Sequence, residues 1–560
     1  MSSAPQAPDD AARTVLYLAD AVYSPADPFA TAVLVEGDRV AWVGSQEAAR
    51  AQRARADVVV EAPGTLVTPG FVDAHVHVTE TGLALGGVDL AGARSAAELL
   101  DRVAAAAAQH PGAAVLGHGW DESAWPEAAL PGREQLDRAA GGAPVLLSRV
   151  DVHSALVSSA LAERAVLAGR DGWDGGALVT LAAHDAARDA TRRLSPAERE
   201  RHQRRALTAA AAAGVAAVTE CAAPHVGSPE DLRALRERSD AGDVPEVLAY
   251  WGALASDEEE ARAHLADVEG AGVLGLAGDL CVDGSYGSRT AWLREPYADV
   301  PATGAPGDRG VAHLGAEQVA AHLVACTRAG VQGGVHAIGD AACDALVEGL
   351  LAAERVVGTP ALASARHRVE HLEAPSARAV AELARLGVVA SVQPSFDARW
   401  GGDGGVYARR LGPSRAAGLN PLADLAAAGV PLALGSDAPV TPLDPWGAVR
   451  AATAMSGERD GRGQSLSARA AFLAHTRGGW RAARRDGEGT LVPGALATLA
   501  VWAVGDLVVQ SADARVSSWS TDPRSGVPGL PDLAPGAPAP RCLRLLRAGR
   551  VLHDTGELAA

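Results

Sequence analysis

A chain of 560 residues, 48% of them hydrophobic, can bury a large core and has room for one elaborated α/β barrel with an accessory domain. The formal net charge of −18 argues against nucleic acid as a partner, because binding to phosphates requires a basic patch. All 50 basic residues are arginines, so the chain contains no lysine.

The cysteines and the first residues bear on the compartment in which the protein works. The five cysteines are odd in number and lack CxxC spacing, which is typical of reduced thiols in a cytoplasmic protein. Met1 to Asp10 is polar and acidic and lacks the basic and apolar regions of a secretory signal. No uncharged apolar run is long enough for a membrane span. We therefore predict a cytoplasmic protein that does not bind a membrane. The sequence does not decide between a monomer and a homodimer.

The two ends of the chain share a β-rich pattern. Residues 12–66 contain apolar runs separated by Gly-Asp and Gly-Ser turns, which predicts a small antiparallel β unit. A similar pattern returns at residues 500–504 and 543–552. We therefore predict one small β-sandwich domain built from both termini, with residues 1–66 and 489–560 as its two parts.

Residues 67–488 have a different pattern, in which short β-like runs alternate with Ala- and Leu-rich helical stretches. Eight such runs predict an α/β fold, a (β/α)8 TIM-like barrel with its chemistry at the C-terminal ends of the strands. An insertion at about 79–200 follows the first strand, and we expect it to be irregular. An arginine-rich helix from Ser195 to Ala213 is expected to stop at Gly214. The eight runs are 71–77, 215–220, 247–251, 280–283, 334–338, 366–371, 388–393 and 432–437.

Chemically active side chains lie at the ends of these runs. His75 and His77 share one face of a strand, because alternate residues point to the same side. A single histidine after a strand is more often structural, but four histidines and an aspartate on one rim predict a site for zinc or a similar divalent ion. The residues at the run ends are His75, His77, Glu220, Asp283, His336, His371, Gln393 and Asp437.

Several of these residues belong to ordered motifs. The motifs are Pro69 to His77, Asp283 to Ala291, His336 to Asp340, Arg368 to His371, Gly435 to Asp437 and the turn from Gly489 to Gly494. With them the sequence resembles the amidohydrolase superfamily, and within it the amidohydrolase 3 or YtcJ-like group, which includes N-substituted formamide deformylases. The resemblance implies that His75, His77, His336, His371 and Asp437 are metal ligands and that Asp437 is also the proton shuttle.

The chain departs from this group at one position. Many relatives place a lysine four residues before the Asp-Gly of the central motif, where it can be carboxylated and bridge two metal ions. Asp279 occupies that position here, and no lysine elsewhere can replace it. Either a carboxylate such as Asp279 or Glu220 bridges two ions, or the site holds one. We expect one ion, because the side chain of Asp279 is short and neither carboxylate is expected to bridge tightly.

Weaker signals point to residues that contact a small-molecule substrate. Asp283 and Arg289 lie in the central motif, and the alternative interpretation is that they form a structural pair beneath the rim. The residues predicted to contact the substrate are Asp283, Ser285, Arg289, Trp120, His153 and Gln393. The histidines outside any motif, which we expect at the surface, are His118, His184, His202 and His225.

These observations predict a metal-dependent hydrolase of a C–N bond, in an amide or formamide of a small organic molecule. A divalent ion lowers the pKa of bound water from about 15.7 toward about 7. Asp437 would take the proton of that water and pass it to the leaving nitrogen, while His371 or His336 stabilises the developing oxyanion. The alternatives are an ester or lactone hydrolase or a deaminase on the same scaffold, or a degenerate, non-catalytic protein with a regulatory or binding role.

Overall fold

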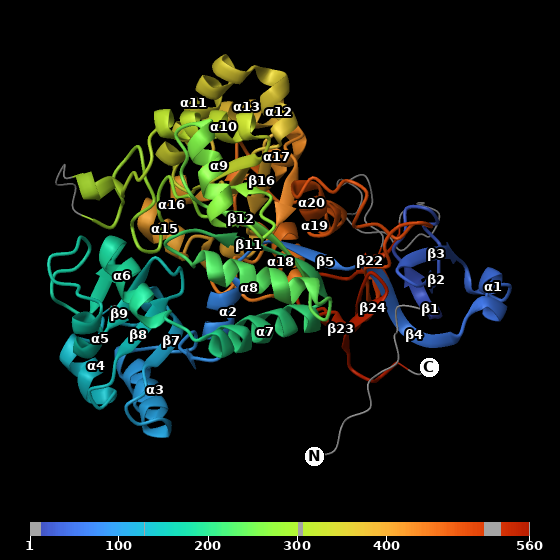
Figure 1. Ribbon diagram of the computed structural model, residues 1–560, viewed down its shortest axis with the longest axis horizontal. Coiled ribbons are helices and arrows are strands. Elements are labelled where there is room, and N and C mark those ends of the chain that lie inside the picture. The colour runs from blue at the N-terminus through green and yellow to red at the C-terminus, as the bar shows by residue number, and fades with distance from the viewer. Residues whose placement is uncertain (1–12, 128, 301–305, 509–527, 559–560) are drawn as a thin grey trace.

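The computed structural model describes residues 13–127, 129–300, 306–508 and 528–558. Strands from both ends of the chain form one seven-stranded sheet, in the order β24-β23-β20-β4-β1-β2-β3, and they lie together at one side of the molecule (Figure 1). Its strands are β1 (Thr14–Val22), β2 (Ala32–Glu36), β3 (Arg39–Gly44), β4 (Val58–Pro69), β20 (Leu499–Ala503), β23 (Arg541–Arg547) and β24 (Arg550–Asp554).

The predicted antiparallel pairing is wrong at one place in this sheet. β1 and β4 are parallel, because the β2–β3 hairpin lies between them in the sequence and provides the crossover. Alternating valines such as Val33, Val60 and Val501 point to one face and are buried in a common cluster. A single sheet therefore unites the two ends of the chain, and its description as a β-sandwich stays a prediction.

Eight parallel strands carry the centre of the molecule. They form the sheets β12-β11-β5 and β13-β14-β15-β16-β17. A parallel bridge between Val76 and Ala438 joins the two sheets at one edge, and the Leu274 N–H donates to the Ala249 carbonyl (2.8 Å) at the other. The strands are β5 (Phe71–Val76), β11 (Val215–Ala222), β12 (Glu246–Trp251), β13 (Gly275–Leu276), β14 (Gln332–Ala337), β15 (Arg368–His371), β16 (Val389–Val392) and β17 (Leu432–Leu434).

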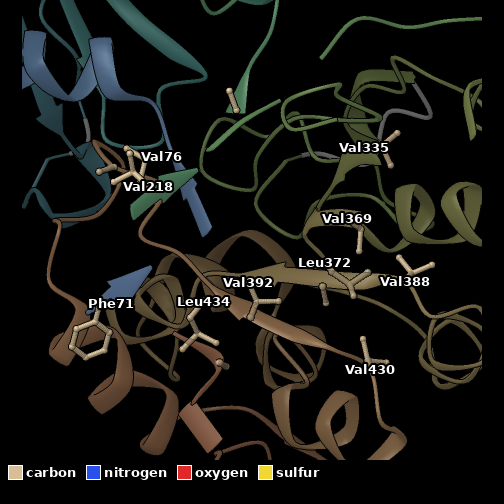
Figure 2. Close-up of a cluster of buried hydrophobic side chains, with 14 of the residues drawn as sticks. Phe71, Val76, Val218, Val335, Val369, Leu372, Val388, Val392, Val430 and Leu434 are labelled. Carbon is tan, nitrogen blue, oxygen red and sulfur yellow. The ribbon is translucent and has the colours of Figure 1, made fainter. Parts of the chain in front are cut away.

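The buried faces of these strands are rich in β-branched residues, which fit a pleated surface. Figure 2 shows this cluster, with Val218 from β11, Val335 from β14 and Val392 from β16 among its members. Because parallel strands are covered by helices on one side and by each other's side chains on the other, they read as continuous apolar runs. This explains why the sequence pattern locates most of them.

Helices follow the strands and cover the central sheets. The prediction for the arginine-rich helix is confirmed: Ser195 caps it with its hydroxyl, and Gly214 follows its end at φ +79°, a left-handed conformation that suits glycine. The helices around the central strands are α7 (Pro196–Ala212), α8 (Pro229–Asp240), α9 (Glu258–Asp267), α10 (Ala316–Ala329), α11 (Asp340–Val357), α12 (Thr359–Ala365), α13 (Ala377–Arg385), α17 (Leu422–Ala428), α18 (Pro445–Thr453), α19 (Ala468–Ala474) and α20 (Arg477–Ala482).

The sequence suggested an irregular segment after the first central strand, and this prediction is wrong. The segment forms its own five-stranded sheet, β10-β9-β8-β7-β6, which packs with its helices beside the central strands (Figure 1). Leu99, Leu136 and Leu147 belong to its separate buried core. The prediction failed because these strands are short and interrupted by glycine-rich turns. The elements are α2 (Val78–Ala84), β6 (Val88–Asp89), α3 (Ala96–Gln109), β7 (Val115–Trp120), α4 (Arg133–Ala139), β8 (Val145–Arg149), β9 (Ser154–Val157), α5 (Ser159–Arg164), β10 (Leu178–Thr180) and α6 (Leu181–Thr191).

The predicted strand at 280–283 is also wrong. The fourth central strand is the two-residue β13, and in 280–283 only Cys281 forms an isolated bridge, to His336. Gly278, at φ +84°, turns the chain between β13 and residues 280–283. Asp279 therefore directly follows a turn at the end of β13. The remaining short elements are α1 (Gln46–Ala49), α14 (Pro394–Trp400), α15 (Val406–Leu411), α16 (Pro413–Ala417), β18 (Glu458–Arg459), β19 (Arg462–Gly463), β21 (Leu507–Val508) and β22 (Leu530–Pro531).

Candidate metal centre

Six side chains from five central strands converge at one end of the sheets. His75 lies in β5 and His77 directly after it, His336 lies in β14, and His371 ends β15. Asp437 follows β17, and Asp279 follows β13. The four histidines and Asp437 are each at most 6% exposed, and the Asp279 side chain is 15% exposed. The structure thus brings together the five residues predicted as ligands and adds Asp279 to them.

The donor atoms of His75, His77 and Asp437 are spaced like three ligands of one ion, and both oxygens of Asp279 lie beside them. The Nε2 atoms of His75 and His77 lie 3.4 Å apart, and they lie 3.4 and 3.2 Å from Oδ1 of Asp437. Asp279 places Oδ1 3.4 Å from His75 Nε2 and Oδ2 3.2 Å from His77 Nε2. Zinc with bonds of about 2.0–2.1 Å in tetrahedral geometry separates its ligands by about 3.3–3.4 Å. The donors present therefore fit a divalent cation.

Unsatisfied atoms support this fit. Oδ1 of Asp279, Oδ1 of Asp437 and Nδ1 of His336 are buried and make no hydrogen bond to any described residue. Buried polar atoms normally have a partner, so such a group of them needs an explanation. His336 Nδ1 lies 3.8 Å from Asp279 Oδ1, so the three atoms belong to one cluster. A cation between the carboxylates and imidazoles would satisfy all of them.

The charges of the cluster agree with this interpretation. Although burial opposes it, the imidazoles of His77 and His75 hold the pKa of Asp279 well below its usual value, so this carboxylate is charged. Burial likewise lowers the pKa of His77, but Asp279 and Asp437 outweigh it and raise that pKa to about 10. Without a metal, the cluster therefore holds protons in place of a cation, and metal binding releases them.

Neighbouring side chains fix the orientation of two histidines. His75 Nδ1 lies 2.9 Å from Glu370 Oε2, and Arg368 forms an ion pair with Glu370 at 2.5 Å. Burial would raise the pKa of Glu370, but Arg368 and His75 lower it to about 2, so its charged carboxylate accepts the Nδ1–H of His75. His75 Nε2 is then free to bind a cation. His371 Nδ1 lies 2.8 Å from Gln393 Oε1, which orients the second ring in the same way.

Two of the converging residues have an unusual backbone conformation. Asp437 has φ +54° and His371 has φ +68°, in the left-handed region that residues other than glycine seldom adopt. The Asp437 N–H donates to the His75 carbonyl (2.8 Å), and the His77 N–H donates to the Ala438 carbonyl (2.9 Å). These bonds tie β17 to β5 and hold the conformation. Such local strain is frequent at functional sites.

The other predicted bridging carboxylate lies outside the cluster. Glu220 lies in β11 and accepts the Val78 N–H at 2.7 Å, so it holds the chain just after His77. Burial raises its pKa to about 7. Asp279 reaches the cluster although its side chain is short, because the turn at Gly278 brings its backbone close.

The predicted substrate contacts separate into two groups. Asp283 accepts the backbone N–H groups of Trp292, Ile338 and Gly339 at 2.8–2.9 Å and is fully buried, so it anchors the loop after β14. It does not pair with Arg289, which instead forms two bonds to Asp299 at 3.1 and 2.7 Å.

Other members of that predicted set hold loops in place or face the open space. Trp120 packs in the core of the insertion and donates its indole N–H to the Leu147 carbonyl. Ser285 donates to Asp151 Oδ2 at 2.8 Å and, like His153, lines a cavity beside the cluster. His153 faces His336 with ring centres 5.7 Å apart, and burial lowers its pKa to about 4.

Two cavities adjoin the cluster. The larger has a volume of about 300 Å³ and is lined by His77, Asp279 and His153 and by residues of α6. The smaller, of about 40 Å³, reaches His336, His371 and Asp437 and has the aromatic rings of Phe396, Trp400 and Tyr407 in its wall. A cavity of the larger size accommodates a small organic molecule.

Sequence reasoning missed several residues around this site. His184 and His225 were expected at the surface, but both line the larger cavity, and His184 is only 3% exposed. Arg368 and Glu370 were read as part of a motif without a role. Two charged residues at alternate positions of a buried strand are a signal that could have identified them, because buried charges require partners.

Comparisons with known proteins agree with this geometry. A family described as "Amidohydrolase family" matches residues 58–552. The chain belongs to the amidohydrolase family. It is 27% identical over 469 residues to the putative amidohydrolase YtcJ of Bacillus subtilis, a match that covers 78% of this chain and 82% of that protein. It is 34% identical over 136 residues to the N-substituted formamide deformylase of Arthrobacter pascens, which covers 23% of this chain and 25% of that one.

A solved structure extends the match to the fold. An uncharacterized metal-dependent hydrolase from Pyrococcus furiosus is 25% identical and superposes with a TM-score of 0.66, covering 87% of this chain and 98% of its own. With the parallel central strands, this supports an α/β fold of TIM-barrel type. Within the described ranges, every helix is too short or too polar to cross a membrane.

Proposed function

We propose that this amidohydrolase is a metal-dependent enzyme that hydrolyses the C–N bond of an amide or formamide in a small organic molecule. The observation that carries the proposal is the pair of imidazoles of His75 and His77, whose Nε2 atoms lie 3.2–3.4 Å from oxygens of both Asp279 and Asp437, beside a cavity of about 300 Å³. The partial match to a formamide deformylase supports the choice of bond. We also propose a small domain from residues 1–66 and 489–560, and a catalytic domain from residues 67–488.

We propose one ion, most readily zinc, held by His75, His77, Asp437 and Asp279. A divalent ion bound there would supply Lewis acidity, which makes water nucleophilic at neutral pH and polarises a carbonyl group. His336 also approaches the cluster, with its Nδ1 3.8 Å from Asp279 Oδ1. If a second ion binds, Asp279 is the carboxylate placed to bridge, because it lies near His336 as well as His75 and His77.

The residues around the cluster have separable roles in hydrolysis. Asp437 is buried beside His75 and His77, so its carboxylate is placed to take a proton from a water at the cluster and return it to the leaving nitrogen. His336 and His371 lie at the smaller cavity and would stabilise negative charge on the carbonyl oxygen. The aromatic wall of that cavity excludes water from the leaving group.

The test combines metal content with a substrate panel. The purified protein should contain about one divalent ion per chain, and a strong chelator should abolish hydrolysis. Zinc-loaded protein would be assayed on N-formyl amines, amides, esters, lactones and amino-heterocycles, with product release followed by chromatography. A metal-free protein whose activity survives the chelator would refute metal dependence. Turnover restricted to esters or lactones would refute the C–N assignment, and turnover restricted to amino-heterocycles would refute the amide assignment. Both outcomes would leave the metal centre intact.

A further inference from the structure

The larger cavity has two chemically different ends. His77 and Asp279 of the metal centre lie at one end, and one face of α6 in the insertion lies at the other. Leu181, His184 and Arg188 recur at helical spacing, so they line the cavity together. A molecule that fills the cavity and reaches the metal centre also contacts this helix.

Arg188 is a buried cation that lacks a full set of partners. It is 8% exposed, and its guanidinium makes no hydrogen bond to any described residue. Its closest anion is Glu80, with NH2 and Oε2 4.0 Å apart. The other oxygen of Glu80 is already paired with Arg192 Nε at 2.5 Å. Two guanidinium groups thus share one carboxylate, so Arg188 lacks a close ion pair of its own.

The remaining charged groups of the cavity form no ion pair with Arg188 among the described residues. Asp279 also lines the cavity, but it lies at the opposite end, in the metal centre. Asp185 lies on the same face of α6, but its side chain is 44% exposed, so solvent screens it, and it forms no ion pair with Arg188. Burial lowers the pKa of His184 well below its usual value and that of His225 to about 3, so both are neutral. Burial, and then the neighbouring Arg192, lower the pKa of Arg188 to about 10, and it keeps its charge at neutral pH.

We propose that Arg188 binds a carboxylate of the substrate, so that the bond hydrolysed at the metal centre belongs to an N-formylated or N-acylated amino acid or a similar small carboxylic acid. The planar guanidinium offers two parallel N–H donors that match the two oxygens of a carboxylate. Anchoring one end of the substrate also holds its amide at the other end of the cavity. This inference rests on the proposed hydrolysis and adds the substrate class to it.

The test compares substrates that differ only in the carboxylate. Zinc-loaded protein would be assayed with N-formylphenylalanine, its neutral amide N-formylphenylalaninamide, and N-formylphenethylamine, which lacks the group. The variants are Arg188→Gln, Arg188→Lys and, as a matched control, Arg164→Gln, which changes an exposed arginine of α5. We expect wild type to prefer N-formylphenylalanine by about 10²-fold in kcat/KM.

Arg188→Gln should lose that preference while its kcat/KM for N-formylphenethylamine changes less than about threefold, and Arg188→Lys should keep part of it because it keeps the charge. Arg164→Gln should behave as wild type. An equal loss on charged and neutral substrates would assign Arg188 a structural role and overturn the proposal. The Lys variant decides the question if the Gln variant does not fold, because its preference for the charged over the neutral substrates should fall below that of wild type. An unchanged preference in it would also overturn the proposal.

Equilibrium binding separates this inference from the proposed function. Calorimetric titration of the zinc-loaded protein with 3-phenylpropionate and with 3-phenylpropanol needs no turnover. Arg188→Gln should raise the Kd of 3-phenylpropionate at least tenfold and leave the Kd of 3-phenylpropanol unchanged. If 3-phenylpropionate binds wild type and the variant equally, the carboxylate contacts only the metal and the inference fails. If wild type hydrolyses no amide but the binding difference is present, the proposed function fails and the anion site stands.

Discussion

Asp279→Asn is the substitution that tests the metal centre most directly. The change keeps the size of the side chain but removes its charge and replaces one oxygen with an amide nitrogen. Both oxygens of Asp279 face imidazole nitrogens, at 3.4 Å for His75 and 3.2 Å for His77. Whichever way the amide turns, its NH2 group therefore points at a metal-binding nitrogen or at the cation itself. The substitution should remove one donor of the set.

The magnitude follows from the share of one donor in a four-donor site. Apparent binding free energies for structural zinc sites with four protein ligands are about 10–16 kcal/mol, or roughly 2.5–4 kcal/mol for each donor. That share corresponds to a zinc Kd raised by about 10² to 10³. Glu220→Gln is the matched control, because it also removes a buried acid close to the cluster but leaves an oxygen to accept the Val78 N–H. We expect it to change the zinc Kd less than about threefold.

Zinc affinity would be measured by competition with a chromophoric chelator, and bound metal by elemental analysis. Circular dichroism would show that both variants are folded. If folded Asp279→Asn bound zinc within about threefold of wild type, Asp279 would not be a ligand and the reasoning from its distances would be refuted. If wild type bound two ions of similar affinity and the variant only one, Asp279 would be a bridge and the proposal of one ion would be wrong.

The other predictions concern the residues around this centre. Asp437→Asn should keep the fold and lower kcat by about 10² to 10⁴, and near-wild-type turnover in the metal-loaded variant would exclude Asp437 as the proton shuttle. Glu370→Gln should raise the zinc Kd by about 10- to 100-fold in the same chelator assay, because it loosens the ring of His75; an unchanged Kd would contradict this role. Bicarbonate during metal loading should not change the recovered activity, because the chain has no lysine to carboxylate; a dependence on bicarbonate would contradict this. His322 accepts the Ala255 N–H and donates to the Leu276 carbonyl, and burial lowers its pKa to about 4. As the pH falls below about 6.5, the unfolded chain binds a proton at His322 before the folded protein does, so the stability that His322 contributes is lost. Urea unfolding of the metal-free protein should show that His322→Gln reduces the loss of stability between pH 7 and 5 by about 2 kcal/mol, and an unchanged loss would count against it.

The sequence predicts the central strands well for a physical reason. Strands buried on both faces need apolar side chains at nearly every position, so runs such as those around Val218 and Val335 stand out from the helices. The positions of His75, His77, His336, His371 and Asp437 follow from those runs, because ligands at strand ends converge in a parallel α/β fold. In the insertion the apolar pattern is interrupted, as in β7, where Gly117, His118 and Gly119 lie within the strand.

Contacts between distant residues could not be predicted in this way. Glu370 orients His75 across 295 residues of sequence, and nothing in either motif indicates the pairing. Arg188 lies on a helix whose apolar face reads as ordinary packing, and only the structure shows that this face borders the cavity of the metal centre. The prediction that His184 and His225 lie at the surface was wrong for the same reason.

The position of Asp279 shows how a short carboxylate reaches the cluster in a chain that has no lysine. A lysine reaches further from the backbone than an aspartate, so an aspartate can serve only if its backbone lies closer to the cluster. Gly278 provides that approach: a Cβ atom on it would lie 3.0 Å from Cα of Cys221 in β11, and its φ of +84° suits glycine. The chain after β13 therefore packs directly against β11 and turns Asp279 toward His75 and His77. Because β13 ends at Leu276, the turn precedes the run at 280–283 that the sequence suggested as a strand, and the carboxylate is supplied by the turn and not by that run.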